Sequence, residues 1–282
     1  MITTHQNGAN VSVLLAARSI NPLSRLFQRE LSALLEQLES RRPRLGAVII
    51  GFDAGPIGSR HELDHLMALT PAQAADCMHM LDAYNALLRR LENLGVPVVA
   101  TLSGDIRGHA FGLALACHRR IALADACFSL PQVRQGLAPV GGEITRSVRL
   151  AGLQAAMPLL LDGATLTAAQ ALHAGLLHAV AATDAELTAH VLDNAVAMQP
   201  WDHKNYRLPG GGLDAAAVRG WLPSAPAQLR ERAGGPSPAA EAVLCAMVEG
   251  MQVDFANALR IESRYFCQTA INPAQRNSSF SL

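Results

Sequence analysis

The feature that most constrains the fold is an alternation of short apolar runs with longer stretches of helical periodicity. Apolar runs of strand length cover residues 10–17, 45–52 and 96–104. Between them, apolar residues recur at helical spacing after Pro22 and again over 71–95. The order of strand, helix, strand, helix, strand predicts an α/β protein with buried parallel strands.

The second half of the chain has a different pattern. After Gly163 it becomes mostly helical, and a long helical stretch covers residues 237–269 with Gly250 as an interruption. We therefore expect an α/β core over residues 1–200 and a helical C-terminal region over 201–282.

Helix caps can also be predicted near the N-terminus of the chain. Asn21 precedes Pro22 and a series of regularly spaced leucines. Asparagine is a favoured N-cap and proline suits the first helical turn. The sequence therefore predicts that the first helix begins at Asn21.

Composition excludes several classes of protein. Hydrophobic residues make up 50% of the 282 residues and charged residues 16%, which is enough to bury a large core. The formal net charge is zero, and no basic stripe alternates with aromatics, so we expect neither nucleic acid nor a membrane as partner. No cysteine pair forms a C-x-x-C, which favours reduced thiols and a cytoplasmic location.

One short motif indicates metal chemistry. HELDH begins at His61 and matches H-E-x-x-H, which on a helix puts His61 and His65 on one face, as in zinc peptidases. Zinc needs a third protein ligand, and no G-x-x-H follows. The next helix offers Glu92, which we expect to be a solvated partner of Arg89 or Arg90. A metal-dependent hydrolase built on HELDH is therefore an alternative, and no metal is our main expectation.

Residues 96–180 carry a resemblance that changes the interpretation. They include VPVVATLSGDIRGHAFGLALACHRRIALADACFSLPQVRQG and LDGATLTAAQALHAGLLHAV. This succession resembles the enoyl-CoA hydratase/isomerase (crotonase) superfamily, most of all the hydratase part of bacterial multifunctional fatty-acid oxidation proteins. The resemblance implies a crotonase-like spiral of ββα units, with a helical C-terminal region that forms homotrimers or hexamers. It also implies an acyl-CoA thioester as substrate or ligand, with no other cofactor.

The resemblance assigns roles to four positions. The oxyanion hole of the family is made by two backbone N–H groups, which correspond here to His61 in SRHEL and His109 in GHAFG. The two acid–base glutamates of the family correspond to Gly112 and to Gln132 in LPQ. Glycine has no ionisable group, and glutamine accepts no proton near neutral pH. We therefore expect hydration to be impaired.

Two further points remain open in the sequence. Glu143 lies in PVGGEITR, a glycine-rich entry to a helix, and could substitute for the missing acids. We favour a simpler role for it as a first-turn residue stabilised by the helix dipole. The alternatives to a thioester-binding enzyme are a non-catalytic oligomeric pseudoenzyme, and a looser metal or heme site that uses His61 and His109.

Overall fold

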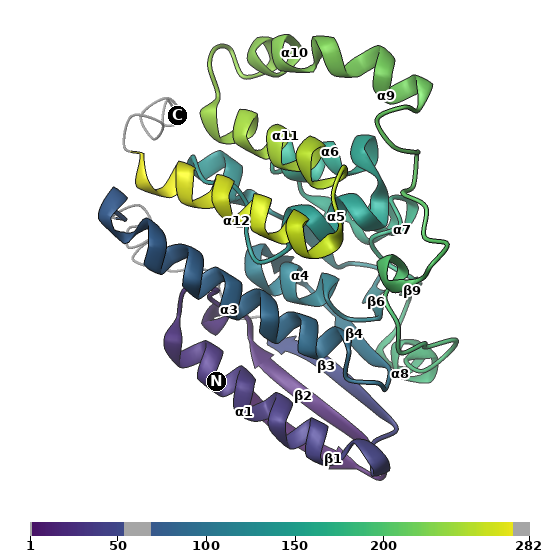
Figure 1. Ribbon diagram of the computed structural model, residues 1–282. Helices are drawn as coiled ribbons and strands as arrows, with labels where there is room; N and C mark the ends of the chain where they lie inside the picture. Colours follow the sequence, from purple (N-terminus) through teal and green to yellow (C-terminus); the bar gives the residue numbers. More distant parts are fainter. Residues whose placement is uncertain (1, 54–68, 273–282) are drawn as a thin grey trace.

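The structure is a computed structural model, which describes residues 2–53 and 69–272 (Figure 1). Its strands are β1 (Ile2–Asn7), β2 (Asn10–Ala16), β3 (Ala47–Asp53), β4 (Val98–Leu102), β5 (Asp105–Arg107), β6 (Arg119–Leu123), β7 (Cys127–Ser129), β8 (Leu166–Thr167) and β9 (Ala179–Ala181). Its α-helices are α1 (Arg25–Ser40), α3 (Ala74–Glu92), α4 (Gly108–Leu115), α5 (Glu143–Ala151), α6 (Leu153–Leu161), α7 (Ala168–His173), α8 (Asp184–His190), α9 (Ala216–Trp221), α10 (Ala225–Arg232), α11 (Pro238–Gly250) and α12 (Phe255–Ile271). Short 3₁₀ helices are η1 (Ala17–Ser19), η2 (Arg42–Arg44), η3 (Pro71–Gln73), η4 (Pro131–Gln135), η5 (Pro200–Asp202) and η6 (Leu222–Ser224).

The strands of the described residues form two sheets. The larger has the order β1-β2-β3-β4-β6-β9, and the smaller has the order β5-β7-β8. From β2 to β9 the larger sheet is parallel, as the sequence predicts. The chain alternates between the sheets, since β4 and β6 lie in the larger one while β5 and β7 lie in the smaller one. The consecutive strand pairs β4–β5 and β6–β7 thus each contribute one strand to the larger sheet and one to the smaller sheet.

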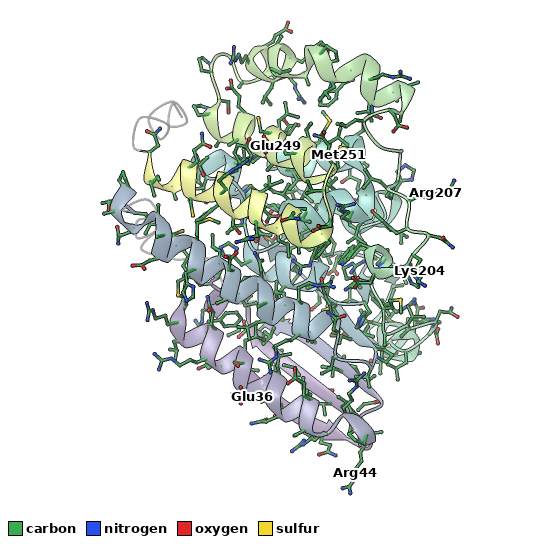
Figure 2. All side chains as sticks on the ribbon, viewed as in Figure 1. Glu36, Arg44, Lys204, Arg207, Glu249 and Met251 are labelled. Carbon is green, nitrogen blue, oxygen red and sulfur yellow. The ribbon has the colours of Figure 1, made fainter. Side chains whose placement is uncertain are left out.

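The central strands are buried on both faces. Val98, Val99 and Ala100 of β4 are each 0% exposed, so side chains that point to opposite sides of the sheet are both covered. On one side α1 and α3 pack together, and α12 lies beside α3 and against α11 (Figure 1). Charged side chains such as Glu36 and Arg44 lie on the outside of this layer (Figure 2).

Two details of the N-terminal region differ from the sequence prediction. Strand β1 was not expected, because ITTHQN is mostly exposed and lacks an apolar alternation; it pairs antiparallel with β2. The first helix begins at Arg25, and its N-cap is Ser24, whose Oγ accepts a hydrogen bond from the Phe27 N–H at 3.2 Å. The cap prediction at Asn21 was wrong, because the Asn21 side chain accepts from the Leu23 N–H in a turn before the helix.

The C-terminal helices follow the prediction closely. The interruption expected at Gly250 is where α11 ends, and Asp254 caps α12 by accepting from the Asn257 N–H at 2.8 Å. Between Gly163 and residue 200 the helical content is carried by two short helices, since α7 ends at His173 and α8 at His190. No helix in residues 2–53 or 69–272 is both long and apolar enough to cross a bilayer.

Candidate active site

Helix α4 provides the first part of the site. It begins at Gly108, which has a φ of +52°, and it follows directly from β5, so GHAFG opens a helix. His109 lies in its first turn, where backbone N–H groups have no partner within the helix and the dipole favours negative charge. His61, the other expected oxyanion residue, lies outside the described residues.

Helix α5 provides the second part. It begins at Glu143, directly after Gly141 and Gly142, whose φ angles of +78° and +84° require residues without a Cβ. A Cβ at Gly142 would also lie 1.6 Å from Arg146 Nη1. The double glycine therefore lets the chain turn sharply into α5 and place Glu143 in the interior, where it is 1% exposed.

The Glu143 carboxylate is the centre of a polar cluster. Its Oε1 lies 2.7 Å from His109 Nδ1. Its Oε2 accepts from Gln132 Nε2 at 2.7 Å and from the Val140 N–H at 3.1 Å. A carboxylate can only accept, so Nδ1 of His109 carries the hydrogen of this bond and Nε2 carries the lone pair in the neutral ring.

Gly112 belongs to the same cluster because it has no side chain. A Cβ at Gly112 would lie 2.5 Å from Glu143 Cγ and 2.8 Å from Glu143 Oε1. The Glu143 side chain thus fills the space into which residue 112 would project. The glycine at 112 and the glutamate at 143 therefore belong to one structural arrangement, in which the side chain of one fills the space left by the other.

Gln132 lies between the two helices. It is 8% exposed, and its Nε2 lies 3.7 Å from the place of a Cβ on Gly108, at the start of α4. Its Oε1 is buried and accepts no hydrogen bond within the described part of the chain. Because buried acceptors are nearly always satisfied in folded proteins, this oxygen has an unused capacity to accept a hydrogen bond.

The structure thus brings together His109, Gly112, Gln132 and Glu143, and it does not describe His61. Glu143 is a first-turn residue of α5, as the sequence indicates. Its contact with His109 and Gln132 was missed, since α4 and α5 meet only in the folded protein. One signal in the sequence favoured this contact. Glu143 is an acid, and it lies in a glycine-rich stretch that follows Gly112 and Gln132, the two positions expected to have lost a glutamate.

A buried ion pair supports the helix that carries Glu143. Arg146 Nε donates to Glu92 Oε1 at 2.7 Å, and both side chains are 0% exposed. Glu92 also pairs with Arg89, as expected, but the prediction that it is solvated was wrong. The Glu92 side chain is 0% exposed, so water does not reach its carboxylate. His118 lies next to it, accepting from the Val98 N–H and donating to the Glu92 carbonyl, and burial lowers its pKa.

Glu262 of α12 holds the N-terminus of α5. Its Oε1 accepts from the Gly142 N–H at 2.8 Å, and its Oε2 accepts from the Thr145 N–H at 2.9 Å and the Thr145 hydroxyl at 2.6 Å. These bonds satisfy donors that have no partner within the helix. Burial raises the pKa of Glu262 to about 7, although the hydrogen bonds from Thr145 oppose the shift.

The raised pKa of Glu262 predicts a pH-dependent stability. A carboxyl group whose pKa rises from 4.5 to about 7 on folding binds a proton more tightly in the folded state. Its contribution is therefore complete below about pH 4.5 and is lost as the pH rises through 7, by about 3 kcal/mol in total. We therefore expect the free energy of urea unfolding of the wild-type chain to include a contribution from Glu262 at pH 5 that is absent at pH 8. Glu262→Gln should remove this contribution and so reduce the difference between the two pH values. The exposed control Glu36→Gln should leave the difference unchanged, and an unchanged difference in Glu262→Gln would contradict the prediction.

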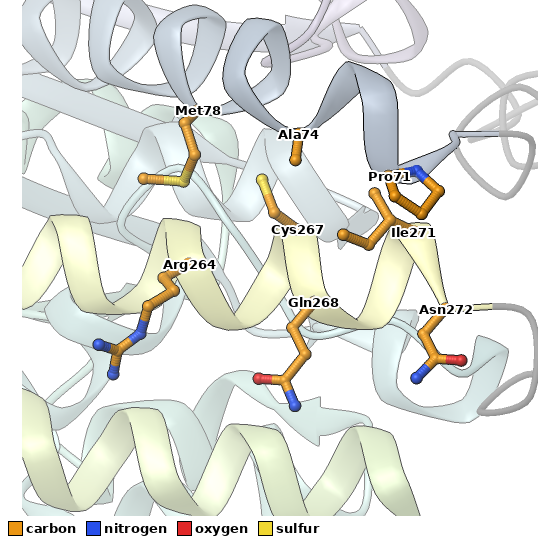
Figure 3. A pocket seen from close by; sticks show the side chains of 8 residues that line it. All are labelled: Pro71, Ala74, Met78, Arg264, Cys267, Gln268, Ile271 and Asn272. Atoms are coloured by element: carbon orange, nitrogen blue, oxygen red, sulfur yellow. The ribbon is translucent and has the colours of Figure 1, made fainter.

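A separate pocket of about 520 Å³ lies between the start of α3 and the end of α12 (Figure 3). Pro71, Ala74, Met78 and Ile271 give it apolar walls, and the remaining lining residues are Arg264, Cys267, Gln268 and Asn272. None of the four cluster residues lines it.

Metal ligands do not gather in the described ranges. Within them there is no group of three or more His, Cys, Asp or Glu side chains placed to hold a metal ion. HELDH lies outside these ranges, so the zinc hypothesis stays a prediction.

Solved structures define the fold class. An enoyl-CoA hydratase from Mycobacterium avium subsp. paratuberculosis shares the fold with a TM-score of 0.59, at 21% identity over 98% of this chain and 93% of that one. An enoyl-CoA hydratase from Bacillus anthracis matches with a TM-score of 0.55, at 21% identity over 94% of this chain and 89% of that one. The fold is therefore crotonase-like, with a helical C-terminal region, as the sequence predicts.

Sequence comparison then gives the family. The family model described as enoyl-CoA hydratase/isomerase matches residues 6–205, and the chain belongs to this family. The chain is also 28% identical, over 273 residues, to the fatty acid oxidation complex subunit alpha of Idiomarina loihiensis. This match covers 94% of the chain but 38% of the length of that relative. The expected likeness to bacterial fatty-acid oxidation proteins is confirmed.

Proposed function

We propose that this chain binds an acyl thioester of coenzyme A at the start of α4 and hydrates enoyl-CoA poorly. The observation that carries the proposal is that Gln132 lies beside the start of α4, where His109 stands in the first turn and Gly112 follows one turn later. There, backbone N–H groups and the helix dipole would stabilise negative charge on the thioester oxygen. Family membership supports the ligand class, and the name of the Idiomarina relative supports a fatty acyl group.

The acyl part of the ligand needs apolar surface. The pocket between α3 and α12 has apolar walls, and its volume of about 520 Å³ lies within the usual range for small-molecule sites. Since none of the four cluster residues lines this pocket, it supports an apolar ligand group without placing that group beside α4.

The impairment follows from the acid–base groups. A hydratase needs one group to activate water and one to deliver a proton to the neighbouring carbon, and each contributes about 10²- to 10⁴-fold to the rate. Gly112 and Gln132 supply neither. The buried Glu143 is one carboxylate in place of two, and its oxygens are already occupied by His109, Gln132 and the Val140 N–H.

A second function deserves a test because Glu143 is 1% exposed and fully hydrogen-bonded. A cluster closed in this way fits a non-catalytic oligomeric module that lost its substrate and kept its surfaces. Such a module would form a homotrimer or hexamer in solution and bind no thioester.

The proposal predicts binding without efficient hydration. We expect calorimetry to detect butyryl-CoA binding, and crotonyl-CoA hydration to be at least about 100-fold slower than in an enoyl-CoA hydratase that carries both glutamates. Hydration within about tenfold of that enzyme would overturn the impairment. Absence of binding, together with a trimeric or hexameric mass by light scattering, would favour the non-catalytic module.

A further inference from the structure

The contact between α4 and α5 lacks a side chain at position 112 but contains the carboxylate of Glu143. Gly112 removes a side chain from α4, and the Glu143 side chain from α5 occupies the space that it leaves. The carboxylate has two donors on one oxygen, Gln132 Nε2 and the Val140 N–H, which fix its position. Its other oxygen is directed at His109 Nδ1, 2.7 Å away.

Exposure separates the roles of the two residues. The Glu143 side chain is 1% exposed, whereas the His109 side chain is 17% exposed. In a neutral imidazole whose Nδ1 donates to a carboxylate, the lone pair is on Nε2, on the opposite side of the ring. The buried acid thus fixes the tautomer and the orientation of a partly exposed base.

We propose that His109 and Glu143 form an acid–base dyad in place of the two glutamates at positions 112 and 132. His109 is the catalytic residue, and Glu143 is a positioning residue that acts through it. This inference rests on the proposed function, because the dyad needs a bound thioester to act on.

The reaction that the dyad supports is enolisation. The C2–H bond of the acyl group breaks, its electron pair moves into the thioester carbonyl, and the proton goes to His109 Nε2. The oxygen becomes an enolate, which the N-terminus of α4 stabilises. Return of a proton from Nε2 to C2 restores the thioester, so the cycle needs no oxidant and no second substrate. The Glu143 carboxylate stabilises the imidazolium in between.

Gln132 gives an independent indication of a ligand. Its Oε1 is an acceptor without a partner in the described part of the chain, on a side chain that is 8% exposed. Its Nε2 donates to Glu143, so the amide cannot rotate to give Oε1 another hydrogen-bond partner without breaking this bond. A bound hydroxyl or a water beside the thioester would satisfy it.

The test is exchange of the C2 protons of butyryl-CoA in D₂O, followed by mass spectrometry. The wild-type chain should exchange them, and His109→Ala should exchange them at least about 100-fold more slowly. Glu143→Gln, which keeps the shape of the side chain, should slow exchange by about tenfold or more. Exchange by the wild-type chain and by both variants is compared at saturating butyryl-CoA, so that a change in Kd does not enter the comparison.

Two further measurements distinguish chemistry from structure. Added imidazole should restore exchange to His109→Ala, which a purely structural histidine would not allow, and His109→Gln should show the same loss as the alanine variant. His79→Ala, on the exposed face of α3, is the matched control and should exchange normally.

Each failure has a different meaning. Binding by the wild-type chain without exchange, or exchange that both variants retain within about threefold, would overturn the dyad alone. Absence of butyryl-CoA binding by the wild-type chain would overturn the proposed function and the dyad with it.

Discussion

Arg146→Met is expected to lower the free energy of unfolding by about 3 kcal/mol or more, a large share of the stability of an ordinary domain. Arg146 is fully buried, and its Nε lies 2.7 Å from Glu92 Oε1. Methionine fills similar space but leaves the buried Glu92 carboxylate with Arg89 as its remaining partner among the described residues. Arg146 also donates to the Gly141 carbonyl at 3.0 Å, so the turn before Glu143 loses a contact as well.

Arg230 provides a matched control. Its Nε lies 2.7 Å from Glu241 Oε1, the same atoms at the same distance as in the Arg146–Glu92 pair, but the Arg230 side chain is 58% exposed. Exposed ion pairs contribute little, since water screens them. Urea unfolding followed by circular dichroism should therefore show a large loss for Arg146→Met and almost none for Arg230→Met. Equal losses would contradict the role of burial, and Arg146→Met/Glu92→Gln should recover part of the stability because no unpaired charge remains.

Gly112→Ala is expected to cost about 1–3 kcal/mol, although alanine is normally the better helix former. Its Cβ would lie 2.5 Å from Glu143 Cγ, and Cγ cannot move away without breaking the bonds of a buried carboxylate. Gly112→Glu should cost more, because it adds a second buried carboxylate beside the first. A glutamate at this position therefore conflicts with Glu143.

A double-mutant cycle tests the conflict directly. In a Glu143→Ala background the space is empty, so Gly112→Ala should lose most of its cost, which gives a coupling of about 1–2 kcal/mol. Gly220 is the matched control, since it is also helical and a Cβ there meets nothing within 4 Å. Gly220→Ala should leave the urea midpoint unchanged or raise it. Additive effects of the changes at 112 and 143 would show that Glu143 does not occupy this space.

Much of the fold could be predicted from the sequence because its signals are local. The apolar runs at 10–17 and 96–104 contain β2 and β4, the run at 45–52 contains β3 except for its last residue, Asp53, and Gly250 ends a helix as expected. Strand β1 could not be predicted in this way, since ITTHQN carries no apolar pattern and is a strand only because β2 pairs with it. The same holds for Glu92, whose burial depends on a residue 54 positions away in the sequence.

The sequence by itself determined the succession of strands and helices, the likeness to the enoyl-CoA hydratase/isomerase family, and the absence of an acid at positions 112 and 132. These are properties of residue type and spacing. The tertiary structure alone decided where the remaining acid lies. Glu143 follows Gly112 by 31 positions, and nothing in the spacing indicates that the two share one space. Packing of α5 against α4 brings the carboxylate to His109 and Gln132, because a helix that carries glycine at the contact leaves room for a side chain from its neighbour.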